Sequence, residues 1–250
     1  MVRRRGLLLT FVCAGLVSLA GCGGSNGDDA DGAVRWIEGP VIGYAGSENV
    51  GLRGVSYTEA SEVVLATGVL IGVPSARIAV ELVDPAGLGP AAFWPLFPGG
   101  MPTACSLLAS PTLADVRVSV INEGVFEVVG APGYVMQATV DPRAGGPLEP
   151  GARLYLRLVS QAAASITGTC TYAFEDAGEP YTETYELDLV AGWNTIAWRI
   201  DTVGDDGSMT SSTLRTEAPA SNAAWYFMDG FGTVAGALVR DAHRAVWRLR

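Results

Sequence analysis

The stretch YTETYELDLVAGWNTIAWRID, residues 181–201, decides the fold class. Up to residue 189, every second residue is aromatic or aliphatic except for one glutamate: Tyr181, Glu183, Tyr185, Leu187 and Leu189. The residues between them are polar, and a Val-Ala-Gly turn leads into a second alternating run that contains Trp193 and Trp198. Alternation with period two is typical of a β-strand with one buried face. The stretch therefore predicts two antiparallel strands joined as a hairpin.

Similar runs continue along most of the chain. Alternating or β-branched segments lie at residues 33–38, 54–72, 76–84, 115–122, 124–130, 134–141, 152–160 and 165–174. Turn-forming groups such as Asn-Glu-Gly and Asp-Pro separate them, at intervals typical of a sandwich or barrel. No helical periodicity interrupts residues 33–215, which argues against parallel βαβ units. We expect an all-β fold, an antiparallel β-sandwich built as one elongated unit or two small ones.

A segment rich in proline, residues 87–112, interrupts the alternation. Proline removes a backbone donor, so this segment is not a central strand. We expect a packed connection that ends a first β unit at residues 33–112 and precedes a second at 113–216. Its Phe93 and Trp94, together with Trp193, are candidates for a platform on which a ligand stacks. The alternative is that these aromatic rings simply pack in the interior.

Composition and motifs exclude several function classes. The chain has 250 residues and a formal charge of −10, which makes nucleic acid an unfavourable partner. The only histidine is His243, so neither a serine–histidine–aspartate triad nor a zinc site is supported. No phosphate-binding loop is present either. We therefore expect no metal, no cofactor and no catalytic residue, although 26 acidic residues leave open a carboxylate pair suited to glycoside hydrolysis.

The N-terminus carries the most specific motif. Three arginines at residues 3–5 precede an uncharged apolar run at residues 6–20. The motif Leu19, Ala20, Gly21 and Cys22 overlaps the end of this run. This layout resembles the lipobox signal peptide of bacterial lipoproteins. The resemblance implies that residues 1–21 are a signal peptide, that Cys22 receives the lipid, and that residues 22–32 are a flexible tether to the membrane. A permanent N-terminal membrane helix is the alternative.

The compartment follows from that resemblance. Gly23 stands where an aspartate would favour retention in the inner membrane, so the resemblance favours the outer membrane of the bacterial envelope. In an exported chain, Cys105 and Cys170 remain as an even pair, for which a disulfide is the simplest arrangement. Two separate buried thiols are the alternative.

The C-terminal residues 217–250 differ in character from the strands. They begin with a short linker-like run, and Arg240, Arg244 and Arg248 then recur at a spacing of four. This spacing predicts a short amphipathic helix with a basic face. Such a helix would dock on the acidic body, or contact anionic lipid or a partner protein.

These observations together predict a lipid-anchored exported envelope protein with a structural or binding role, not catalysis. Its partners would be the membrane, through the N-terminal lipid, and other envelope proteins. The pattern LxLxxGWN at residues 187–194 is similar to hairpins of β-rich envelope lipoproteins of uncharacterised role, and it implies no activity. The alternatives are a solute- or glycan-binding module that uses Phe93, Trp94 or Trp193, and an envelope hydrolase with a carboxylate pair.

Overall fold

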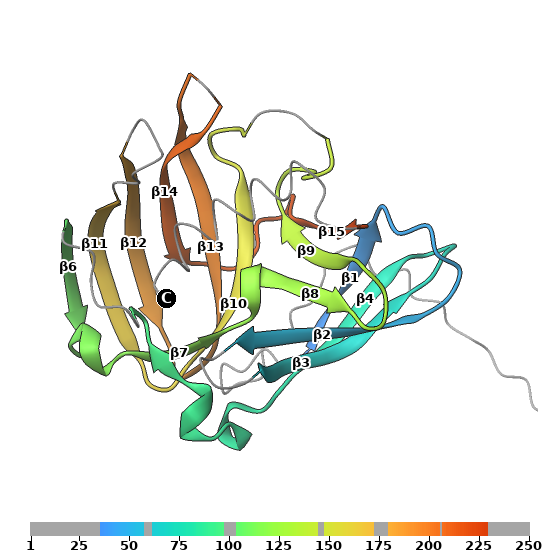
Figure 1. Ribbon diagram of the computed structural model, residues 1–250, viewed down its shortest axis with the longest axis horizontal. Helices are drawn as coiled ribbons and strands as arrows, with labels where there is room; N and C mark the ends of the chain where they lie inside the picture. Colours follow the sequence, from blue (N-terminus) through green and yellow to red (C-terminus); the bar gives the residue numbers. More distant parts are fainter. Residues whose placement is uncertain are drawn as a thin grey trace, which may run out of the picture.

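A computed structural model of the chain describes residues 36–57, 62–97, 104–144, 148–172, 180–205 and 207–229. The described residues form strands joined by turns and four short 3₁₀ segments, so the expectation of an all-β fold is confirmed (Figure 1). The lipobox with Cys22, the tether and the predicted C-terminal helix with His243 lie outside the described residues. In the described part, no helix is long and apolar enough to cross a membrane.

Fifteen strands make up the described fold. They are β1 (Trp36–Ile42), β2 (Val50–Tyr57), β3 (Glu62–Ile71), β4 (Arg77–Leu82), β5 (Trp94–Pro95), β6 (Cys105–Ser110), β7 (Arg117–Val120), β8 (Val125–Val128), β9 (Tyr134–Ala138), β10 (Arg153–Ser160), β11 (Ala164–Tyr172), β12 (Tyr181–Leu189), β13 (Gly192–Val203), β14 (Met209–Thr216) and β15 (Ala224–Met228). The 3₁₀ segments are η1 (Pro85–Gly87), η2 (Pro90–Ala92), η3 (Leu113–Asp115) and η4 (Asn122–Gly124).

Seven of these strands close into a barrel in the order β15-β1-β4-β3-β2-β8-β9. Closure depends on β15, which pairs in parallel with β1 (Val41 opposite Trp225) and antiparallel with β9 (Tyr226 opposite Met136). The last described strand therefore joins the first. Closing a sheet in this way removes the free strand edges that would otherwise invite pairing with other chains.

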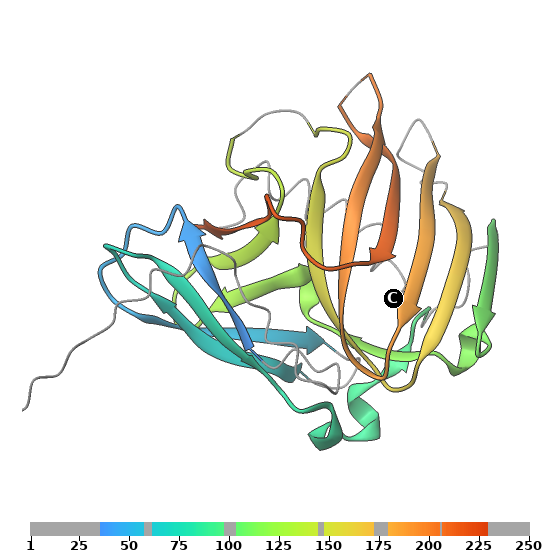
Figure 2. The same ribbon diagram turned by 180° about the vertical axis from the view of Figure 1, so that it is seen from behind.

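The remaining strands extend from the barrel as a curved sheet in the order β9-β10-β13-β14-β12-β11-β6 (Figures 1 and 2). Strand β10 connects the two parts. Its first half pairs with β9, where Leu154 lies opposite Ala138, and its second half pairs with β7, where Leu158 lies opposite Val120. The short strand β5 pairs in turn with β7.

Two hydrophobic cores correspond to these two parts. One fills the barrel with side chains such as Leu65, Leu70 and Phe126, and Trp193 joins it from the sheet. The other covers one face of the curved sheet, which we call the inner face, with side chains such as Leu156 and Trp198. On the opposite face, which we call the outer face, β11 and β12 carry Ser, Thr, Glu and Asp side chains, whereas Val159 and Trp193 pack into the barrel core. Burial of these apolar surfaces is the main stabilising contribution to both parts.

The hairpin predicted for residues 181–201 is wrong, although both of its strands form. Strand β12 does not pair with β13; β14 lies between them, parallel to β12 and antiparallel to β13. The connection at residues 190–191 is as short as expected, and the Asn194 side chain bonds both the N–H and the C=O of Val190 at 2.9 Å. Alternation indicates which face of a strand is buried, whereas the identity of its neighbour depends on contacts distant in sequence.

The division of the chain in space differs from the expected boundary at residue 112. Barrel strands come from residues 36–82, 125–138 and 224–228. Part of the expected linker at 217–250 is thus the barrel strand β15. Within the segment at residues 87–112, Leu96 and Phe97 pack against the core of the curved sheet, and residues 105–110 form the edge strand β6. The finer expectation of a two-sheet sandwich stays a prediction.

Candidate functional site

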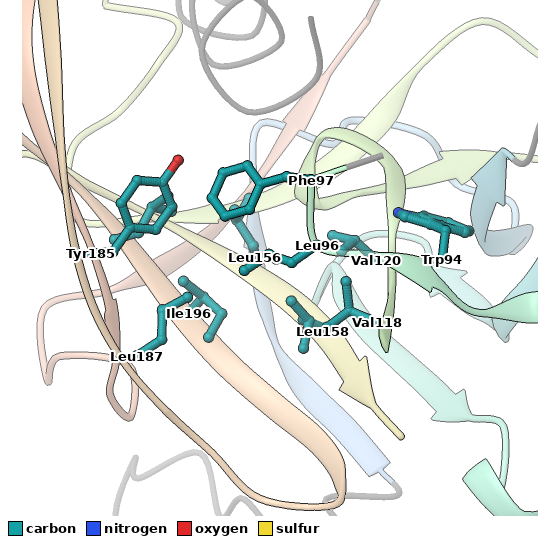
Figure 3. Close-up of a pocket in the computed structure, with 11 residues that line it drawn as sticks. Trp94, Leu96, Phe97, Val118, Val120, Leu156, Leu158, Tyr185, Leu187 and Ile196 are labelled. Carbon is teal, nitrogen blue, oxygen red and sulfur yellow. The ribbon is translucent and has the colours of Figure 1, made fainter. Parts of the chain in front are cut away.

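A pocket opens on the inner face of the curved sheet, where the sheet meets β7 and the segment from Trp94 to Phe97 (Figure 3). Strands β10, β12, β13 and β14 contribute its floor, because their alternation directs leucine and isoleucine side chains to this face. The described lining residues are Trp94, Leu96, Phe97, Val118, Val120, Leu156, Leu158, Tyr185, Leu187, Ile196 and Leu214. Figure 3 shows Trp94 at one end of the pocket, and Tyr185 and Phe97 at the other.

The pocket is almost wholly apolar. The only side-chain polar atoms among its described lining residues are the Tyr185 hydroxyl and the Trp94 indole nitrogen. Its cavity volume is about 50 Å³, and the pocket is open to solvent on one side. Sites for small molecules are commonly lined in this way, by aliphatic and aromatic side chains with few polar groups.

A buried glutamate lies beside this pocket. Glu183 is completely buried because it shares the inner face of β12 with Tyr181 and Tyr185. Its Oε1 accepts a hydrogen bond from the Tyr181 hydroxyl at 3.2 Å, and its Oε2 accepts one from the Tyr185 hydroxyl. The Tyr172 hydroxyl of β11 lies 3.0 Å from that of Tyr185 and 3.5 Å from Oε2. Three phenols thus surround one carboxyl.

Strands β13 and β14 complete this carboxyl cluster. The Trp198 indole N–H donates to the Ser212 hydroxyl oxygen at 2.8 Å, and Ser212 shares a further hydrogen bond with Tyr181. Every polar side-chain atom of Trp198 and Ser212 therefore has a partner although both residues are buried. Satisfied polar groups of this kind favour one strand order over others, since an alternative order would leave them unpaired in the interior.

Burial determines the protonation behaviour of the carboxyl cluster. It raises the pKa of Glu183 to about 7, although the hydrogen bonds from the tyrosine hydroxyls act in the opposite direction. Burial, and then the nearby Glu183 carboxyl, raises the pKa of Tyr185 well above its ordinary value. The same causes raise the pKa of Tyr172 and of Tyr181. The phenols consequently remain neutral donors at neutral pH, while the carboxyl is poised between its two forms.

Tyr185 links the carboxyl cluster to the pocket. Its ring lies edge-on to Phe97 with the ring centroids 5.7 Å apart, and both rings line the pocket. Its hydroxyl, by contrast, is bonded to Glu183 and Tyr172. Glu183 itself does not line the pocket, so a molecule bound there would contact the phenol ring rather than the carboxyl. The arrangement is suited to holding an apolar group, and the carboxyl cluster fixes one of its walls.

The aromatic residues singled out from the sequence lie in three different places. Trp94 is half-buried and lines the pocket. Phe93, its neighbour, is half-buried and packs against the barrel core instead. Trp193 is buried in the barrel core, where its indole N–H donates to the Val83 carbonyl oxygen at 2.9 Å. The three rings therefore do not form one stacking platform.

The disulfide between Cys105 and Cys170 is present, as the sequence predicted. The two residues lie directly opposite each other on β6 and β11, with their Cα atoms 4.1 Å apart. The bond fastens the edge strand to the sheet. Among the described residues, no group of three or more histidine, cysteine or acidic side chains could hold a metal ion. The groups that contact Glu183 likewise include no second carboxyl in the described part.

A second buried ionisable group lies where β10 meets the barrel. The Arg157 guanidinium donates to the Gln137 side-chain oxygen at 2.7 Å and lies 5.8 Å from the centre of the Trp225 ring. Its Nε has no hydrogen-bond partner in the described structure. Burial lowers the pKa of Arg157 to about 10. A cation without a carboxylate partner is costly in such a place.

The burial of Glu183 was not predicted from the sequence, although the alternation of its strand indicates it. Glu183 lies on the face of its strand that is otherwise apolar, two residues after Tyr181 and two before Tyr185. An acidic side chain on a buried face needs hydrogen-bond donors, and the nearest tyrosines provide them. The pocket had no such signal, because its lining comes from six strands and a loop segment that are far apart in the sequence.

Comparison with known proteins gives no match. No family model, no curated protein and no solved structure matches the chain. The functional assignment therefore depends on the residues and the geometry described above.

Proposed function

We propose that this chain is a lipid-anchored exported envelope protein with a non-catalytic binding role, and that its inner-face pocket holds an apolar small molecule or an apolar part of a larger one. The observation that carries the binding role is the apolar lining of the pocket. The anchor is supported by the lipobox at residues 19–22 and agrees with a disulfide, which forms in oxidising compartments.

The chemistry of the pocket selects the ligand class. A sugar offers many hydroxyl groups that need polar partners, whereas the described lining has only the Trp94 indole nitrogen and the Tyr185 hydroxyl, which is already bonded to Glu183. An alkyl chain or an uncharged ring needs only apolar contact, which Leu156, Ile196 and Trp94 supply. The hydrolase alternative gains no support, because no second carboxyl among the described residues contacts Glu183, and Glu183 does not line the pocket. Binding of an apolar ligand is therefore favoured over glycan binding and over hydrolysis.

Titration with N-phenyl-1-naphthylamine, an uncharged apolar dye that fluoresces in apolar surroundings, tests the binding role. We expect a saturable rise in fluorescence. Trp94→Ala should weaken binding about tenfold, because the ligand loses apolar contact with the indole ring. Trp36→Ala is the matched control, since Trp36 lies on the outside of the barrel with 52% of its surface exposed, and it should leave the affinity unchanged.

A second variant keeps the test valid if Trp94→Ala does not fold. Leu96→Phe narrows the pocket without removing apolar surface, and it should also reduce dye binding. Urea unfolding of each variant establishes that it is folded. A dye that does not saturate, or that binds Trp94→Ala and Leu96→Phe as tightly as the unaltered protein, would contradict the proposed pocket.

A further inference from the structure

The outer edge of strand β6 is a candidate interaction surface, independent of the pocket. On one side, β6 pairs with β11 over all six of its residues. On its other side no strand in the described ranges pairs with it, and it is the outermost strand of the curved sheet (Figures 1 and 2). An edge of this kind presents backbone N–H and C=O groups that another strand can pair with.

The hydrogen-bond phase of β6 identifies which groups face outward. Thr171 N–H donates to the Ala104 carbonyl at 3.0 Å, so the even-numbered residues of β6 direct their backbone groups towards β11. The backbone groups of the odd-numbered residues therefore point away from the sheet. These residues are Cys105, Leu107 and Ala109.

The chemistry of this edge is unusual for an exposed one. Natural edges are commonly protected by charged side chains, by proline or by bulges. Strand β6, with the sequence CSLLAS, has none of these protections within it. Its Leu108 is 77% exposed, the most exposed large hydrophobic side chain in the described part of the chain. An exposed leucine on an unprotected edge favours contact with another apolar surface.

Charge also favours this place for contact between two copies. The chain has a formal charge of −10, so most of its surfaces repel a second copy. The outer face of β6 and its neighbour β11 carries only Ser, Thr and Leu side chains: Ser106, Leu108, Ser110, Ser165, Thr167, Thr169 and Thr171. Two copies can approach through this face without bringing like charges together.

We propose that β6 pairs antiparallel with β6 of a second copy of this chain, about a two-fold axis at Leu108. Among the registers that the hydrogen-bond phase permits, this one places each Leu108 opposite its counterpart. Leu107 and Ala109 of each chain then exchange backbone hydrogen bonds with Ala109 and Leu107 of the other. The Leu108 pair is a non-hydrogen-bonded pair, in which the facing side chains approach most closely.

Oxidative cross-linking of Leu108→Cys tests this pairing. A disulfide fits a directly opposed non-hydrogen-bonded pair, as Cys105 and Cys170 show within the chain. We expect a covalent dimer whose new bond maps to residue 108 of both copies. Thr167→Cys is the matched control: Thr167 is exposed, lies opposite Leu108 on β11, and would be about 14 Å from its counterpart at three strand spacings.

Sedimentation of the purified protein provides a second readout. The unaltered protein should form dimers as its concentration rises, and Leu108→Arg should remain monomeric because it brings two positive charges together. Equal cross-linking of Leu108→Cys and Thr167→Cys would overturn the proposal. So would an unaltered protein that stays monomeric at every concentration, or a dimer that survives Leu108→Arg and therefore forms through another surface.

Discussion

Ionisation of Glu183 should make the fold less stable as the pH rises through neutrality. Glu183 is completely buried, and burial raises its pKa to about 7 in the folded protein. In the unfolded chain the same group titrates near its ordinary value of 4.5. The folded state therefore holds this proton more tightly. Its stabilising contribution is fully present below about pH 4.5 and is lost as the pH rises towards and through 7.

The size of the effect follows from the two pKa values. One pKa unit corresponds to about 1.4 kcal/mol of free energy. The difference between 4.5 and about 7 thus corresponds to roughly 3 kcal/mol of unfolding free energy, lost between about pH 4.5 and pH 8. Solvent does not screen this contribution, because the side chain has no exposed surface. Such a loss is a large fraction of the stability of a typical domain.

Urea unfolding of the unaltered protein and of Glu183→Gln, followed by tryptophan fluorescence from pH 4 to pH 8.5, measures this effect. Glutamine keeps the volume of the side chain and an acceptor oxygen for the tyrosine hydroxyls, but it does not ionise. The stability difference between the two proteins should shift by about 3 kcal/mol in favour of the variant across this range. Glu38→Gln, at an exposed position on β1, is the control for removing one carboxylate from the chain. A stability difference for Glu183→Gln that does not change with pH would refute the reasoning.

Three further predictions concern stability and use urea midpoints. Reduction of the Cys105–Cys170 disulfide, which closes a loop with a sequence separation of 65, should lower stability by up to about 4 kcal/mol, and an unchanged midpoint would contradict this expectation. Gly168→Ala should destabilise by more than about 1 kcal/mol, because Gly168 has a φ of 133° and an added Cβ would lie 2.0 Å from the Ser106 carbonyl oxygen; Gly87→Ala, where nothing lies within 4 Å, is its control. Arg157→Met combined with Gln137→Leu should be neutral or stabilising by about 1 kcal/mol or more, since the two changes remove a buried cation that has no carboxylate partner in the described structure together with its hydrogen-bond acceptor. A loss of several kcal/mol for this double variant would contradict the expectation that the buried guanidinium is a net cost.

The strands themselves could be predicted from the sequence to a large extent. The alternation at residues 181–189 correctly places Tyr181, Tyr185 and Leu187 on a buried face, and the runs at 134–141 and 152–160 coincide with β9 and β10. Alternation is a local property, because successive side chains of a strand point to opposite faces. It does not depend on which strand lies beside which.

The strand order could not be predicted, for the same physical reason. The short connection at residues 190–191 favours a hairpin, yet β14 separates its two strands. The contacts that place β14 beside β12 include the hydrogen bond between the Tyr181 and Ser212 hydroxyls, which joins residues 31 positions apart in the sequence. Closure of the barrel by β15 is likewise a pairing between the two ends of the described chain.

The candidate site was predictable only in part. Trp94 is one of the candidate stacking residues named from the sequence, and it lines the pocket. Trp193 is another of these candidates, and it is packed in the barrel core, as the alternative of interior packing expects. The burial of a side chain depends on the strands around it. Glu183 could have been identified from the sequence as a buried acid, since it is the one charged residue among the alternating apolar residues of its strand.

The central claim, that this is an exported and lipid-anchored protein, is tested most directly by its intact mass after extraction from bacterial membranes. The mass is measured first without and then with a reducing agent. The account predicts a chain that begins at Cys22, carries two or three acyl chains and gains two hydrogen atoms on reduction of the Cys105–Cys170 disulfide. An unlipidated chain that retains residues 1–21 would contradict the anchor, the compartment and the proposed role in the envelope.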